Sequence, residues 1–282
     1  MKLKMKNFNF LIFLFCSLIL SIPTLTLAKD PHQYSIGKRF CGESLIYDLN
    51  FMVIFHAAEC QVMLMPNPNG RGYLGILSAQ TKGLVNWVTK QRKHIYRAYM
   101  NETDSGHRLQ SWYIEKIVIK GDEKVETRYW LDYKNRRIYY QVLQQNRIVY
   151  MDCDHIPPGV VYDDIISAFY NFRAGSYGAL KPAQNYVINS IPMQNVSTFN
   201  ISTLGAAEEA RKRRSLGWND RGNYLVRALI SKEVFGTKAG IVYGLLDKNS
   251  LPLSGVVEDV IGFGNVEGQL RQAFFNGKPT KF

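Results

Sequence analysis

Alternation of apolar and polar side chains constrains the fold of this chain more than any other feature of its sequence. Over residues 44–53 polar residues take most of the even positions, and the odd positions hold Leu45, Tyr47, Leu49, Phe51 and Val53. Successive side chains of a strand point to opposite faces, so the pattern predicts a strand with one buried and one solvated face. Residues 58–64 repeat the pattern, which predicts a hairpin of 42–52 with 57–65.

Many further segments carry the same signal, and the links between them are short. We expect strands at 73–81, 94–100, 109–120, 124–132, 137–142 and 147–152, and a later set at 185–190, 196–204, 224–231, 240–246, 253–260 and 266–272. A link such as Gly121-Asp122-Glu123 is too short for a crossover. Neighbouring strands are therefore expected to be antiparallel.

One segment, residues 163–173, changes the period. Its apolar residues recur at intervals of three and four behind Asp163 and Asp164, which predicts a helix with an acidic first turn. Residues 206–222 are interpreted as an excursion that includes a short helix or a loop. The expected fold is mainly β, with a strongly curved antiparallel sheet, an open β-barrel or a sandwich around one central α-helix.

The first 28 residues have the pattern of a signal peptide. Lys2, Lys4 and Lys6 precede an apolar run over 10–22, which is shorter than the roughly 20 helical residues needed to cross a bilayer. Thr26-Leu27-Ala28 places small residues where a signal peptidase reads them, so cleavage is predicted after Ala28. We expect residues 29–282 to form a single domain in the periplasm.

The chain carries an excess of positive charge. Its formal charge of +12 falls to +9 when the three lysines of the leader are removed, and this excess favours anionic partners. Arg211, Lys212, Arg213 and Arg214 form the densest basic run. It is interpreted as a solvated loop face, with peripheral contact to an anionic membrane as the alternative. No nucleic acid partner is expected, because an exported protein rarely meets one.

Three cysteines remain after the leader: Cys41, Cys60 and Cys153. In the predicted hairpin Cys60 lies opposite about position 49, which leaves Cys41 on the order of 26 Å away along the ribbon. A disulfide requires Cα atoms within about 7 Å. We therefore expect Cys153 to bond with Cys41 or Cys60, and three unbonded buried thiols are the alternative. No CxxC or HxxxH spacing occurs, so neither a metal nor another cofactor is expected.

The densest group of reactive side chains is Asp152-Cys153-Asp154-His155, with Asp163 and Asp164 close by in sequence. On a strand, the two aspartates face one way while Cys153 and His155 face the other, so the four do not converge. The GxSxG, HExxH and Walker patterns are missing from the sequence. No catalytic residue is assigned, and whether the protein is an enzyme is left open, with a non-enzymatic role favoured.

The order of these segments resembles the DUF3108 family of bacterial exported proteins. The similarity lies in Gly42-Glu43-Ser44-Leu45-Ile46-Tyr47, in the segment 163–170 with Arg173, and in Asp247-Lys248-Asn249-Ser250-Leu251-Pro252. Ala58 differs from the glycine that is usual in that family's hairpin, and the basic excursion after Gly205 is a second difference. The resemblance implies a periplasmic fold with a curved sheet, and it implies neither an activity nor catalytic residues.

Our leading hypothesis is a non-enzymatic envelope protein whose curved sheet binds an apolar or amphipathic ligand, such as a lipid, or another envelope component. A strongly curved sheet with large aromatic residues can leave a concave apolar face. The candidate lining residues are Tyr47, Leu49, Phe51 and Trp112. The alternative is a hydrolase that acts on cell-wall or lipid material through the acidic residues at 152–164. Carboxylates converging in a cleft would favour the hydrolase, and a salt-bridged Asp163 at a helix start would not.

Overall fold

Antiparallel pairing between neighbours builds a single sheet. The computed structural model describes residues 35–51, 54–103, 105–193, 196–218 and 222–282. The strands are β1 (Glu43–Phe51), β2 (Ile54–Pro66), β3 (Tyr73–Thr81), β4 (Lys93–Glu102), β5 (Leu109–Lys120), β6 (Glu123–Asp132), β7 (Arg137–Gln144), β8 (Arg147–His155), β9 (Asn185–Met193), β10 (Val196–Thr203), β11 (Tyr224–Leu229), β12 (Ile241–Leu246), β13 (Pro252–Val260), β14 (Gly264–Phe275) and the short β15 (Lys278–Pro279).

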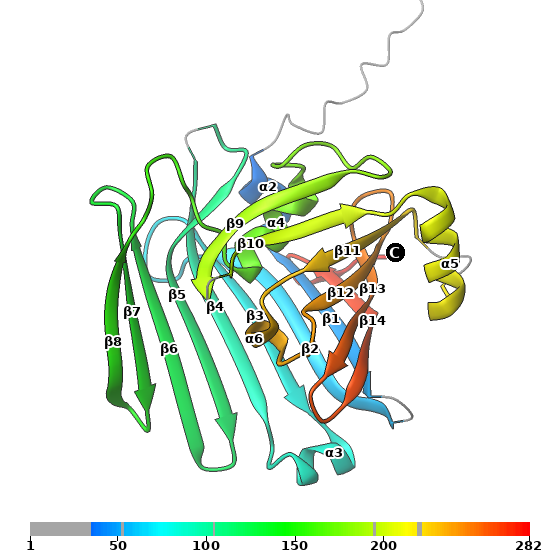
Figure 1. Ribbon diagram of the computed structural model, residues 1–282, viewed down its shortest axis with the longest axis horizontal. Helices are drawn as coiled ribbons and strands as arrows, with labels where there is room; N and C mark the ends of the chain where they lie inside the picture. Colours follow the sequence, from blue (N-terminus) through cyan, green and yellow to red (C-terminus); the bar gives the residue numbers. More distant parts are fainter. Residues whose placement is uncertain (1–34, 52–53, 104, 194–195, 219–221) are drawn as a thin grey trace, which may run out of the picture. The chain divides into compact units, whose positions relative to one another are not determined.

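The strands follow one another in two meanders that together form one open sheet. Strands β1 to β8 form a meander that runs outward from the middle of the sheet, and β9 to β14 form a second meander that returns to pair β14 with β1 (Figure 1). The resulting order is β8-β7-β6-β5-β4-β3-β2-β1-β14-β13-β12-β11-β10-β9, so β8 and β9 are the two edges. The expected curved, mainly β fold is confirmed in its open form, and the sandwich alternative does not apply.

A row of glycines marks a crowded part of the inner face, the side of the sheet on which α4 (Ile165–Ala174) packs. Gly244, Gly255 and Gly268 lie opposite one another across β12, β13 and β14. A Cβ atom on Gly268 would lie 3.1 Å from Leu49 Cδ2, and one on Gly244 would lie 3.2 Å from Val226 Cγ2. Glycine therefore lets inner-face side chains approach the backbone closely where the sheet curves.

Helix α4 fills one end of the space enclosed by the sheet. Its N-cap Asp164 and Ser167 form a capping box, and Gly175 ends it in the left-handed conformation. The side chains of Ile166 and Tyr170 are almost fully buried in the core cluster that β2, β4 and β5 also contribute to. The contact is close, since a Cβ on Gly75 of β3 would lie 2.5 Å from Ile166 Cγ2.

A buried ion pair anchors the last turn of α4 to the middle of the sheet. Arg173 is 4% exposed, and its Nη1 and Nη2 donate to the two carboxylate oxygens of Glu43 at 2.6 and 2.8 Å. Its Nε donates to the carbonyl oxygen of Ser250 at 2.9 Å, and the rings of Phe40 and Phe169 lie 4.7 and 4.9 Å from its guanidinium carbon. Burial alone would lower the pKa of Arg173, but the Glu43 carboxylate raises it above its ordinary value.

Among the described residues four further helices accompany α4, and the sequence had indicated only one of them, the short helix of the excursion at 206–222. They are α2 (Ile36–Phe40), α3 (Gly83–Val88), α5 (Ala206–Leu216) and α6 (Lys232–Phe235). Helix α5 corresponds to the basic excursion. Leu216 and the following Trp218 pack with Leu225 and Tyr243 on the face of the sheet opposite to α4, here called the outer face. No helix in the described part of the chain has the length and apolarity required to span a membrane.

The cysteine prediction is not matched by the structure, in which Cys41, Cys60 and Cys153 are all free. The hairpin is tighter than expected, so Cys60 lies opposite Tyr47 instead of position 49. Cys60 faces inward on β2, whereas Cys153 faces outward on the edge strand β8, about 29 Å away along the sheet at about 4.8 Å per strand. Burial raises the pKa of Cys60 to about 12, so its thiol is unreactive.

The predicted leader and its cleavage after Ala28 lie outside the described residues. Residues 34–282 group into one compact unit. Export, periplasmic location and the exact start of the domain therefore stay predictions.

Removing the Arg173 guanidinium should destabilise the fold strongly. Arg173→Met leaves the Glu43 carboxylate buried without its partner, and breaking a buried pair in this way costs about 3 kcal/mol or more. Arg227→Met removes the exposed pair with Glu208 and should cost less than about 1 kcal/mol. Urea unfolding followed by circular dichroism measures both. Equal, small losses for the two variants would show that the Arg173 pair does not anchor α4.

Candidate functional site

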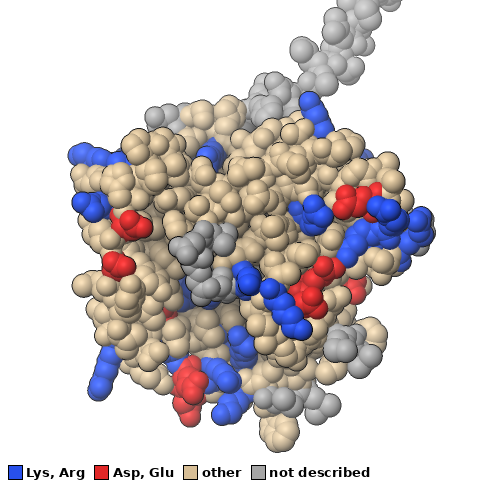
Figure 2. Space-filling model, viewed as in Figure 1, with Lys and Arg blue, Asp and Glu red and all other residues tan. Residues whose placement is uncertain are grey.

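The inner face of β5, β6 and β7 is filled by α4 at one end only. Near the helix, Ile114, Leu131 and Ile138 are buried in the core. Further along the same face the side chains are only half-buried, and we call this set the inner trough: Lys116, Val118, Thr127, Tyr129, Tyr140 and Val142. The space-filling view shows a hollow in the surface, with Lys or Arg side chains visible in its depth (Figure 2).

Tyrosine rings form one wall of the inner trough. Tyr129 and Tyr140 lie opposite each other on β6 and β7 with ring centroids 5.0 Å apart, and Tyr150 of β8 continues the row at 5.5 Å. Burial raises the pKa of Tyr129 well above its usual value, so its phenol is neutral. Such rings offer an apolar surface together with a hydroxyl group, which suits an amphipathic molecule.

Basic side chains lie beside the tyrosines. Arg92 Nε donates to His94 Nε2 at 2.8 Å, and Lys116 Nζ lies 5.4 Å from the ring centroid of Tyr96. Burial, followed by the positive charges of Arg92 and Lys116, lowers the pKa of His94 to about 4. His94 is therefore neutral near pH 7 and accepts the Arg92 hydrogen bond. The Tyr96 hydroxyl donates to the carbonyl oxygen of Val234 in α6 at 3.1 Å.

The structure separates the four lining residues expected from the sequence. Tyr47, Leu49 and Phe51 do share the inner face of β1, but they belong to the core: the Tyr47 hydroxyl donates to the carbonyl oxygen of Pro252 at 2.9 Å, and the Phe51 ring packs 4.9 Å from that of Phe263. Trp112 lies on the outer face of β5. A register shift between Tyr99 and Met100 inserts Trp112 as an extra residue, so it stacks on Tyr99 and Tyr113 there.

Trp112 instead lines a shallow outer groove of about 640 Å³. The outer-face side chains that line it are Trp112, Trp130, Asp132, Tyr139, Gln141 and Met151. Met151 belongs to β8, whose residues are exposed along its whole length. This groove and the inner trough lie on opposite faces of the same strands, so they are separate surfaces.

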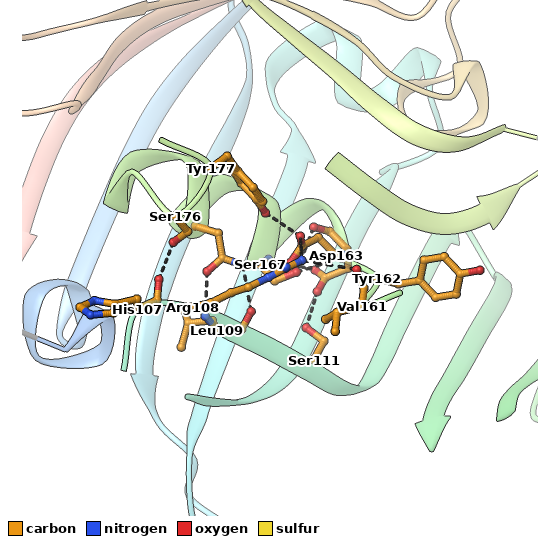
Figure 3. A network of polar contacts seen from close by, with 12 residues as sticks. His107, Arg108, Leu109, Ser111, Val161, Tyr162, Asp163, Ser167, Ser176 and Tyr177 are labelled. Carbon is orange, nitrogen blue, oxygen red and sulfur yellow. Dashed lines mark hydrogen bonds and ion pairs between the residues drawn. The ribbon is translucent and has the colours of Figure 1, made fainter. Parts of the chain in front are cut away.

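Asp163 is fully buried in a polar network at the start of α4 (Figure 3). Its carboxylate accepts from Arg108 Nη2 and from the Tyr177 hydroxyl at 2.5 Å each, and from Asn171 Nδ2 at 2.9 Å. Burial raises the pKa of Asp163, and the Arg108 charge opposes that rise. Its backbone N–H also donates to Asn189 of β9, which ties one sheet edge to the helix.

Of the other acidic residues, Asp164 adjoins this network, and Asp152 and Asp154 lie away from it on β8. Asp164 caps α4 and accepts from the Ser111 hydroxyl at 2.5 Å. Asp152 and Asp154 lie on the inner face of exposed β8, and Cys153 and His155 on its outer face, as strand alternation predicts. The backbone N–H of Cys153 and the Tyr150 hydroxyl lower the pKa of Asp152. These carboxylates do not converge in a cleft. Nor do three or more His, Cys, Asp or Glu side chains of the described residues form a group that could hold a metal ion.

The basic run lies on helix α5, so the short helix expected as one form of the excursion is present and the loop is not. Lys212 Nζ pairs with Glu258 at 2.5 Å and lies 3.9 Å from the ring centroid of Tyr243, and Arg213 pairs with Glu209 one turn earlier. Arg211 and Arg214 are exposed. Two of the four charges therefore have structural partners, and contact of α5 with an anionic membrane stays a prediction.

Comparison with known proteins adds little to this geometry. No known protein family matches the chain, and no curated protein matches it. The similarity to the DUF3108 family therefore remains a prediction. A solved structure from Brucella abortus, described as a beta-barrel-like protein of domain of unknown function DUF1849, aligns with 84% of this chain and 98% of its own at 10% identity and a TM-score of 0.44. A likeness at this level does not bear on function.

The half-buried, neutral imidazole of His94 should make stability depend on pH. Its pKa is about 4 in the folded state against about 6.5 when unfolded, so the unfolded chain binds more protons between these values. This contribution is complete above about pH 6.5 and is lost as the pH falls towards 4, amounting to about 2 kcal/mol between pH 7.5 and pH 5.

Urea unfolding of the His94→Gln variant at both pH values checks this expectation. The loss of stability on acidification should be smaller than in the unmodified protein by about 2 kcal/mol. His155→Gln, which removes an exposed imidazole on β8, is the matched control and should leave the pH dependence unchanged. An unchanged pH dependence in His94→Gln would contradict the placement of a half-buried, neutral His94.

Proposed function

We propose that this protein is a non-enzymatic binding protein of the bacterial envelope, and that its inner trough takes an apolar or amphipathic, lipid-like ligand. The observation that carries the proposal is the incomplete filling of the curved sheet. Helix α4 covers one end of the inner face, and the row of Tyr129, Tyr140 and Tyr150 beyond it is left half-buried or exposed. Apolar, concave surfaces with a few polar groups are typical of small-molecule sites.

The open edge of the sheet supports the same proposal. Because β8 does not pair with β9, a chain-like ligand can reach the inner trough without unfolding a strand. The tyrosine hydroxyl groups would satisfy the polar end of such a ligand, and the rings would cover its chain.

The alternative of a hydrolase has less support. Asp163 is salt-bridged and Asp164 caps the helix, so each has a structural task. Docking of another envelope component has one specific observation in its favour. The apolar residues Ile148, Val149, Tyr150 and Met151 are at least half exposed on the free strand β8, and such edges accept a partner strand.

Native mass spectrometry of the protein purified gently from its own envelope tests the proposal. We expect a fraction of the protein to carry a lipid-like adduct that is released on collisional activation. A ligand-free mass in every preparation, together with no binding of added amphiphiles, would contradict the proposal that the protein binds a lipid-like ligand.

A bulky residue in the inner trough should block it. Val142 and Gln141 are neighbours on β7 whose side chains point to opposite faces of the sheet. Val142→Trp should weaken binding of the neutral probe N-phenyl-1-naphthylamine by about tenfold or more, about 1.4 kcal/mol. Gln141→Trp, the same change on the outer face, should leave it unchanged. Fluorescence titration measures both, and the opposite result would place the ligand in the outer groove.

A further inference from the structure

Charge is divided between the two faces of β4, β5 and β6. On the outer face, Glu115 pairs with Arg97 and Arg128, and Glu126 pairs with Lys124 and Arg128. On the inner face, Lys116 lies against the Tyr96 ring, and Arg92 and His94 are hydrogen-bonded to each other at the same end of β4. The carboxylates of Glu115 and Glu126 thus face away from the inner trough.

The charges that act on His94 at the inner face are both positive. The positive charges of Arg92 and Lys116 both lower the pKa of His94. The neutral imidazole accepts from Arg92 through Nε2, so its single proton is on Nδ1. Arg92, His94 and Lys116 are all half-buried. Partial burial strengthens the attraction between these charges and an incoming anion relative to bulk water.

The tyrosine row begins beside this basic group. Lys116 lies opposite Thr127 on β6, and Tyr129 follows two residues along the same face. A ligand with its charged end at Lys116 would therefore lay its chain across Tyr129 and Tyr140 towards the β8 edge.

We propose that the inner trough binds an anionic amphiphile, with its carboxylate or phosphate group held by Arg92 and Lys116 and its alkyl chain along Tyr129 and Tyr140. This proposal rests on the proposed function and specifies its ligand class. An anion bound by guanidinium and ammonium groups gains charge-assisted hydrogen bonds that a neutral or cationic head group cannot form.

Isothermal titration with four probes of equal chain length tests the head group. The probes are dodecanoate, dodecyl phosphate, 1-dodecanol and dodecyltrimethylammonium, and inorganic phosphate is titrated separately. We expect the two anionic amphiphiles to bind at least tenfold more tightly than dodecanol, and inorganic phosphate to bind much more weakly than dodecyl phosphate. Lys116→Met should remove most of the preference for anions and leave the binding of dodecanol unchanged.

Lys93→Met is the matched control, because Lys93 is the outer-face neighbour of His94 on β4 and its loss lowers the net charge equally. Arg92→Gln serves as the second variant if Lys116→Met does not fold by circular dichroism. Equal binding of anionic and neutral probes to the unmodified protein would overturn the head-group assignment and leave the trough intact. If inorganic phosphate binds as tightly as dodecyl phosphate, the site is one for free anions and the proposal is overturned. If none of the probes binds, the proposed function itself is overturned.

Discussion

The attachment of α4 to three separate parts of the sheet is the constraint on which the rest of the structure depends. At its start, Asp163 is held by Arg108 just before β5 and bonds the backbone of β9; at its end, Arg173 is held by Glu43 of β1. A sheet whose edges do not pair has no closing ladder of hydrogen bonds to fix its curvature. The helix supplies that restraint with buried charges, which are costly unless every partner is present.

The same arrangement produces the site. Because α4 is only ten residues long, it covers the inner face near Ile114 and Leu131 and leaves Tyr129 and Tyr140 half-buried beyond it. The outer face of these strands carries paired carboxylates, and the inner face carries Arg92 and Lys116. Glu115 and Glu126 thus lie on one face and Arg92 and Lys116 on the other, and this asymmetry is the basis for assigning an anionic amphiphile to the interior.

Local patterns in the sequence were sufficient for the strands and for α4. Period-two alternation located 73–81 and 109–120 with the bounds that the structure has. Asp163 and Asp164 located the helix start, but both precede the first turn, and only Asp164 caps it. The site was not predicted, because alternation does not say which face becomes the inside. Trp112 lies on the outer face, opposite to the expected one, since an inserted residue in β5 reverses its face. Lys116 and Tyr140 carried no signal that separated them from ordinary strand residues.

Locating a heavy-atom-labelled ligand in a crystal is the most direct measurement of the central claim, that the unfilled inner face is the binding surface. Crystals grown with 12-bromododecanoate would give an anomalous bromine peak where the end of the chain lies. Our account places this peak within the inner trough, near Tyr140 or Tyr150. A peak in the outer groove between Trp112 and Tyr139, with an empty trough, would contradict it.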